Sequence, residues 1–72
     1  MKEKIIKVIE DVLMLPSGSI TESTKVEDIA EWDSLAHVMI IGELEQQLGI
    51  YISLEDAIQI SGVDEIFKKA GI

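Results

Sequence analysis

Three polar residues that could act together lie near the middle of the chain: Asp33, Ser34 and His37. In a hydrolase, a histidine beside a serine takes the serine proton and an acid orients the histidine. Here Ser34 and His37 are about one helical turn apart, so their side chains would point outward in parallel. No oxyanion hole or buried cleft is evident in so short a chain. A small hydrolase is therefore the least favoured function for these residues.

A different use of Ser34 follows from the helix that it would open. Asp33 is a residue type that caps helices by accepting a hydrogen bond from a first-turn amide. Ser34 would then be the first helical residue, with an outward-facing hydroxyl beside free amides and the positive end of the helix dipole. Because such an end favours phosphate, Ser34 is suited to carry a phosphate-linked group.

The helix that positions this serine is predicted to run from Ser34 to Leu48, with Gly49 as its terminator. Apolar residues at helical spacing predict its buried stripe, with Ile40 beside them. The stripe consists of Leu35, Val38, Ile41, Leu44 and Leu48. Gly42 interrupts the polar face, where it would allow close packing or leave room for a partner.

The chain before this helix predicts one more helix and a long connection. A helix from Lys2 to about Met14 would bury one apolar face and place a Glu3–Lys7 ion pair on the other. The apolar face consists of Ile5, Ile6, Ile9, Val12 and Leu13. Pro16 would end this helix. The connection from 16 to 32 is long for a loop, and Thr24-x-x-Glu27 has the form of a capping box for a short turn over 26–30.

Two shorter elements follow the serine helix. Ser53-x-x-Asp56 is a second capping-box pattern, which predicts a short helix to about Ile60. A last helix carries the apolar stripe of Val63, Ile66, Phe67 and Ala70 and ends at Gly71. The sum is an all-α fold, a bundle of three longer helices and one short helix, with a long loop between the first two.

Composition limits the function further. The 72 residues predict a single domain, 1–72, with a thin core. Fourteen acids against six lysines give a net charge of −8, and no lysine or arginine occurs between Val26 and Phe67. This argues against nucleic acid and favours partners with basic surfaces. No apolar run exceeds four residues and no cysteine or signal-like N-terminus occurs, so we expect no membrane span and a cytoplasmic monomer.

Asp33-Ser34-Leu35 at the start of an amphipathic helix resembles the phosphopantetheine attachment motif of acyl carrier proteins. The likeness covers nearly the whole chain, because the apolar spacing after the serine and Glu55-Asp56-Ala57 follow the family without a gap. It implies an acyl-carrier-type bundle in which a phosphopantetheinyl transferase attaches phosphopantetheine to Ser34. The thiol of that arm would hold an acyl group as a thioester, so the chemistry belongs to the cofactor and partner enzymes. The protein itself would not be an enzyme.

The same resemblance implies roles for the neighbours of Ser34. Asp33 and Leu35 would flank the attachment site, and partners would dock on Trp32, Val38, Met39 and Glu45. These partners would include an acyl- or aminoacyl-activating ligase and an acyltransferase or synthase. From the residues alone, Trp32 could instead pack on the bundle rim. His37 could be a solvated surface residue, a pH sensor or a contact for the arm.

The cargo stays open at this point. The Trp32-Asp33-Ser34-Leu35 form resembles stand-alone carriers outside primary fatty-acid synthesis and also D-alanyl carrier proteins. A fatty acyl group, a polyketide-type acyl group and an amino acid are all compatible with it. The alternative from another class is an acidic helical interaction module that binds a basic partner without any cofactor.

Overall fold

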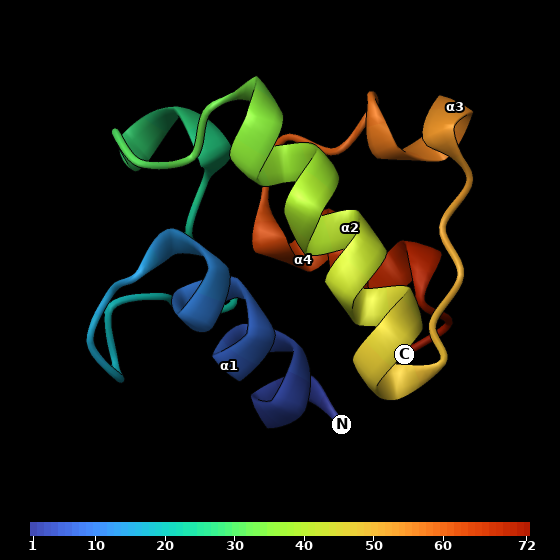
Figure 1. The fold of residues 1–72 in the computed structure, drawn as a ribbon, viewed down its shortest axis with the longest axis horizontal. Helices are drawn as coiled ribbons and strands as arrows, with labels where there is room; N and C mark the ends of the chain where they lie inside the picture. The colour runs from blue at the N-terminus through green and yellow to red at the C-terminus, as the bar shows by residue number, and fades with distance from the viewer.

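The computed structural model describes residues 1–72, and helices dominate it (Figure 1). The elements are α1 (Lys2–Leu13), the 3₁₀ helix η1 (Val26–Asp28), α2 (Ser34–Leu48), α3 (Leu54–Ala57) and α4 (Val63–Lys69). No strand forms, and a single isolated β-bridge joins Lys25 to Gly62. The predicted all-α fold with a long loop between the first two helices is confirmed. None of the helices has the length and apolar character needed to span a membrane.

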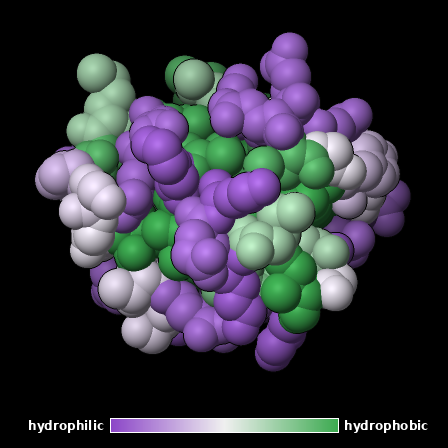
Figure 2. All heavy atoms as spheres, turned by 90° about the horizontal axis from the view of Figure 1, so that it is seen from below, coloured by the Kyte–Doolittle hydropathy of each residue, from purple (hydrophilic) through white to green (hydrophobic).

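The core lies between α1, α2 and α4. Residues with completely buried side chains come from all three helices: Ile5 and Ile9, Ile40 and Leu44, and Val63 and Ile66. Each such side chain contributes about 1.5–3 kcal/mol through burial. In Figure 1, α2 crosses the front of the molecule, α4 lies behind it, and both chain ends lie at the lower end. Figure 2 shows that lower face, where hydrophilic side chains cover much of the surface and hydrophobic atoms are visible between them.

Local signals set both ends of α2. The Asp33 carboxylate accepts a hydrogen bond from the amide of Ala36 at 2.8 Å, which caps the helix at the predicted residue. Gly49 has a φ of 68°, the left-handed conformation that ends many helices. Its amide bonds the carbonyls of the last turn, so that α2 ends at Leu48 as predicted.

The buried face of α2 differs from the prediction in its N-terminal half. Leu35 and Val38 are 70 % and 57 % exposed, whereas Ile40 is fully buried. The stripe prediction is wrong there because apolar residues occur on most sides of this helix, so their spacing alone does not select one face. As a result, the half of α2 nearest Ser34 presents apolar side chains on the surface.

The first helix ends one residue before the predicted limit. Met14 adopts the left-handed conformation with φ 59°, and its amide bonds the carbonyls of the last turn. The predicted Glu3–Lys7 pair is wrong, since Lys7 pairs instead with Asp11 at 3.4 Å. Both partners are exposed, so this pair contributes little to stability.

A buried carboxylate that the sequence analysis did not single out fixes the beginning of the long loop. The side chain of Glu10, 5 % exposed, accepts hydrogen bonds from the amides of Gly18 at 2.9 Å and Ile20 at 3.1 Å. These bonds satisfy loop amides that would otherwise be unpaired, and Ile20 itself is buried. Glu10 therefore anchors the loop to the end of α1.

The two predicted capping boxes have different outcomes. Ser53 accepts a hydrogen bond from the amide of Asp56 and caps α3, as predicted, but α3 ends at Ala57 rather than near Ile60. The short turn predicted over 26–30 is present as η1, but the predicted cap is wrong, because the Thr24 hydroxyl accepts from the amide of Thr21 and does not cap η1.

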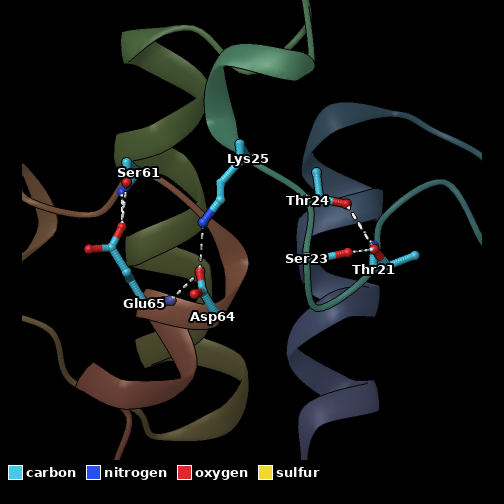
Figure 3. Close-up of polar contacts among 7 residues, drawn as sticks. All are labelled: Thr21, Ser23, Thr24, Lys25, Ser61, Asp64 and Glu65. Atoms are coloured by element: carbon cyan, nitrogen blue, oxygen red, sulfur yellow. Dashed lines mark hydrogen bonds and ion pairs between the residues drawn. The ribbon is translucent and has the colours of Figure 1, made fainter.

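The end of the long loop is fastened to the start of α4 (Figure 3). The amide of Val26 donates to the carbonyl of Ser61 at 2.9 Å, and the amide of Val63 donates to the carbonyl of Thr24 at 3.0 Å. Lys25 and Asp64 form an ion pair at 3.5 Å across the same junction. The loop thus returns along the bundle in a fixed path and delivers the chain to the start of α2.

Candidate functional site

Ser34 lies where the sequence predicts, at the first position of α2 and on the surface. Its hydroxyl makes no hydrogen bond within the protein, and neither do the amides of Ser34 and Leu35. Those amides are orphan donors of the first turn, because no carbonyl one turn earlier in the helix is available to them. The serine oxygen is therefore free to be modified, and two unpaired donors lie next to it.

The electrostatics of this helix end suit a phosphodiester. The fifteen residues of α2 place a partial positive charge of roughly half a unit at its N-terminus. The first turn contains no acidic side chain, and Asp33 is committed to the cap through its bond to Ala36. A phosphate joined to the Ser34 hydroxyl would lie beside the free amides, as anions do at many helix N-termini.

Trp32 is buried, with 4 % of its surface exposed, and it belongs to the core. Of the two roles that the sequence left open, the structure places it in packing. Little surface is left for a partner to touch, so we move Trp32 from the docking residues to the packing residues.

The indole of Trp32 is bonded to His37. Its Nε1–H donates to Nδ1 of His37 at 2.9 Å, and the two ring centres are 6.0 Å apart. On the other side of the imidazole, Nε2 lies 2.8 Å from the carbonyl oxygen of Ala57 in α3. We call this arrangement the Trp32–His37–Ala57 chain. It corrects the prediction of a solvated surface histidine, because His37 is half-buried and bonded at both ring nitrogens.

The same contacts argue against the hydrolase. A general base for Ser34 would need a ring nitrogen that can accept the serine proton. In His37, Nδ1 already accepts from Trp32, and Nε2 lies against the Ala57 carbonyl. No hydrogen bond joins Ser34 to His37, so the pair does not form a nucleophile–base unit.

Two adjoining hollows lie along α2, and the first of them opens beside the serine. The first, about 480 Å³, has Ser34, Asp33 and Trp32 in its lining. The second, about 250 Å³, lies between α2 and α3 and is mostly apolar, with Tyr51 and Leu54 in its lining. Three residues line both hollows and stand at their junction: His37, Val38 and Ile58. Of these, the sequence analysis did not single out Ile58, which lies in the segment after α3.

The predicted docking residues on α2 are all exposed. Met39 is 50 % exposed and lies next to Val38, and Glu45 is exposed further along the helix. Residues 34, 38 and 45 share one side of α2, because eleven residues make just over three turns. A surface with apolar side chains near Ser34 and an acid about 16 Å away thus runs along this helix.

Comparison with known proteins bears on this site. The family model for the phosphopantetheine attachment site matches residues 3–68, which is most of the chain. The chain belongs to this phosphopantetheine-binding family. Members of the family hold phosphopantetheine as a covalently attached group and are carriers rather than enzymes, so the chain is a carrier of the acyl-carrier type.

A solved structure agrees with the family assignment. A Mycobacterium tuberculosis protein assigned as an acyl carrier protein superposes on this carrier with a TM-score of 0.84 and 30 % sequence identity. The match covers 97 % of this chain and 93 % of the other. A search of curated protein sequences found no significant match.

Proposed function

We propose that this carrier holds an acyl group on a phosphopantetheine arm attached to Ser34 and delivers it to partner enzymes. The observation that supports the proposal is the exposed, unbonded hydroxyl of Ser34 at the capped start of α2. When attached, the arm would supply the thiol that holds the acyl group as a thioester. The protein's own part is to anchor the phosphate end and to present a surface to partners.

Asp33 and Leu35 have separate tasks in this proposal. Asp33 caps α2 and so holds the first turn, with its two free amides, in helical geometry beside the attachment point. Leu35 is 70 % exposed directly after the serine, where it offers an apolar contact to an enzyme that approaches Ser34. Neither residue needs to transfer a proton.

The docking surface consists of Val38, Met39 and Glu45, together with Leu35. Methionine is an adaptable side chain, which suits a surface that several enzymes use in turn. The net charge of −8 favours encounter with basic surfaces on those enzymes. The partners we propose are a phosphopantetheinyl transferase, an activating ligase and an acyltransferase or synthase, acting in the cytoplasm in a specialised biosynthetic pathway.

An aminoacyl cargo such as D-alanine is the second candidate. The feature that favours it is Trp32, because this chain resembles D-alanyl carrier proteins in having an aromatic residue directly before Asp-Ser. The two candidates share the same attachment chemistry. They are distinguished by isolating the protein from its native host and identifying the group that is thioester-linked to the arm.

The attachment itself is tested by incubating the purified protein with coenzyme A and a broad-range phosphopantetheinyl transferase. Intact-mass analysis should show one added phosphopantetheine on the wild-type protein and none on the Ser34→Ala variant. Ser61→Ala is the matched control, because Ser61 precedes α4 but its hydroxyl is bonded to Glu65. This control should be modified like the wild type.

The same experiments distinguish the carrier from the cofactor-free interaction module. No added mass on the wild-type protein, or equal addition to Ser34→Ala, would falsify the proposal. If Ser34→Ala retained the full biological role in the native host, a cofactor-free interaction module would explain the protein better.

A further inference from the structure

The Trp32–His37–Ala57 chain has a fixed direction. An indole can only donate and a backbone carbonyl can only accept. Nδ1 of His37 must therefore carry no proton, since it accepts from Trp32 at 2.9 Å, and Nε2 must carry the proton that it donates to Ala57 at 2.8 Å. Only the neutral imidazole with its proton on Nε2 satisfies both bonds. The opposite tautomer would place two N–H groups against each other at Trp32 and two acceptors against each other at Ala57.

This chain connects α3 to α2 and to the residue that precedes the cap of α2. Trp32 precedes the carrier serine by two residues, His37 lies in the first turns of α2, and Ala57 ends α3. A helix of four residues such as α3 has no stability of its own. Of its four residues only Ala57 is buried, whereas Leu54 is 69 % exposed. The other side-chain attachment of α3 is the exposed ion pair of Asp56 with Lys69 at 3.2 Å.

His37 also stands between the serine and the apolar hollow. It lines the hollow beside Ser34 and the smaller hollow between α2 and α3. Its two bonds bring the residue before the cap of α2 and the end of α3 to the same imidazole. A displacement of α3 must therefore either break the bond to Ala57 or move the segment that leads into Ser34.

We propose that His37 is a positioning residue for the carrier serine, which couples the place of α3 to the place of the Trp32–Asp33 segment through a single neutral imidazole. It makes no hydrogen bond to Ser34, and it acts through the two groups that it bonds. The effect on loading rests on the proposed function of Ser34, whereas the coupling of α3 to α2 does not.

The chain of bonds is tested on the unmodified protein by NMR. In the wild type, the nitrogen shifts of His37 should show the Nε2–H tautomer, and the indole proton of Trp32 should be protected from exchange. A mixture of tautomers, or an indole proton that exchanges freely, would overturn the proposal without any variant being made.

Three variants then distinguish the effect of losing the His37 hydrogen bonds from the effect of changing the side chain that packs there. His37→Leu removes both nitrogens, and Trp32→Phe removes only the indole donor. His37→Gln is the matched control, because its amide offers one acceptor and one donor about as far apart as the ring nitrogens. The amides of Ala57, Ile58 and Ile60, which bond within or just after α3, report on that segment.

In His37→Leu those amides should exchange about fivefold to tenfold faster, the effect of one lost hydrogen bond. The amide of Ile9 in α1 should be unchanged. His37→Gln should restore most of the protection, and Trp32→Phe should show a smaller increase than His37→Leu. Equal acceleration at Ile9, or no difference between the leucine and glutamine variants, would contradict the proposal, because a purely structural role predicts either result.

The link to the serine is measured by the rate at which the transferase loads Ser34. His37→Leu should lower kcat/KM about threefold to tenfold, with His37→Gln close to the wild type. Unchanged loading in His37→Leu would refute the link while the exchange data still test the coupling. A wild-type protein that takes no arm at all would refute the function of Ser34 and leave the NMR result standing.

Discussion

The starts of α2 and α4 are two solutions to the same problem, since every helix begins with amides that lack intrahelical partners. At the start of α4 the protein supplies partners for two first-turn amides. The amide of Val63 bonds the carbonyl of Thr24 at 3.0 Å, and that of Glu65 bonds the Asp64 carboxylate at 3.0 Å (the latter in Figure 3). At the start of α2 only the amide of Ala36 is capped, and those of Ser34 and Leu35 stay free.

The two helix starts therefore have different roles, one in the stability of the fold and the other in the proposed attachment of the arm. The start of α4 is closed by the long loop and holds the fold together, with Lys25, Gly62 and Asp64 packed around it. At the start of α2, Asp33 caps the helix and Trp32 bonds His37, while the amides of Ser34 and Leu35 stay without partners. A serine lies at the start of both α2 and α4, but of these two only Ser34 has a hydroxyl without a partner. The comparison predicts that changes at the start of α4 alter stability most and that changes at the start of α2 also alter loading.

The largest effect is expected for Gly62→Ala at the closed start. A methyl group there would lie 3.0 Å from the Asp64 carboxylate and 3.2 Å from the carbonyl of Thr24, and the backbone cannot move away cheaply. We expect a loss of about 1–3 kcal/mol in the free energy of unfolding, measured with urea. Gly42→Ala in α2 is the control, because nothing lies within 4 Å of the added methyl and a gain of up to about 1 kcal/mol is expected. Equal effects of the two variants would contradict the close packing of Gly62.

Asp33→Ala at the open start should have a moderate effect on stability. Loss of an N-cap costs about 1 kcal/mol, because the amide of Ala36 loses its acceptor. Loading of Ser34 should also slow, since the first turn frays. Glu31→Ala is the control, because Glu31 is exposed, carries the same charge and makes no side-chain hydrogen bond. If the two variants unfolded at the same urea concentration, Asp33 would not be acting as a cap.

The smallest effect is a pH dependence at the closed start. Hydrogen bonds from the Ser61 hydroxyl and then the Ser61 amide lower the pKa of Glu65 below its ordinary value of 4.5. A lowered pKa means that the carboxylate stabilises the fold above pH 4.5, and that this contribution is lost as pH falls through 4.5 towards the folded-state pKa.

The measurement compares the wild type with Glu65→Gln across that range. Near neutral pH the variant should be less stable, and the difference should shrink as the pH falls below 4.5. Because other carboxylates titrate in both proteins, only the difference between the two curves is informative. A difference that does not change with pH would show that the Ser61–Glu65 bonds do not favour the charged form.

The sequence predicts best those features that depend on a few adjacent residues. Asp33 and Gly49 mark the ends of α2, and Ser53 marks the start of α3, because each acts on amides or carbonyls within one helical turn. The exposure of Ser34 follows from the same local geometry, so the central residue of the site could be named without coordinates.

The features that the sequence does not predict involve residues far apart in the chain or choices between faces. The bond of His37 to Ala57 spans twenty residues, and that of Glu10 to Ile20 spans ten. One signal was present: a buried indole needs an acceptor, and His37 lies five residues after Trp32. The buried face of α2 was mispredicted because the exposed residues Leu35, Val38 and Met39 are as apolar as those of the core.

The most direct test of the account is to locate the added group after loading the wild-type protein with coenzyme A and a transferase. Fragmentation of the modified protein should place one phosphopantetheine on Ser34, the serine at the open helix start, and none on any other hydroxyl. A phosphopantetheine on Ser61, or on any residue other than Ser34, would contradict the account.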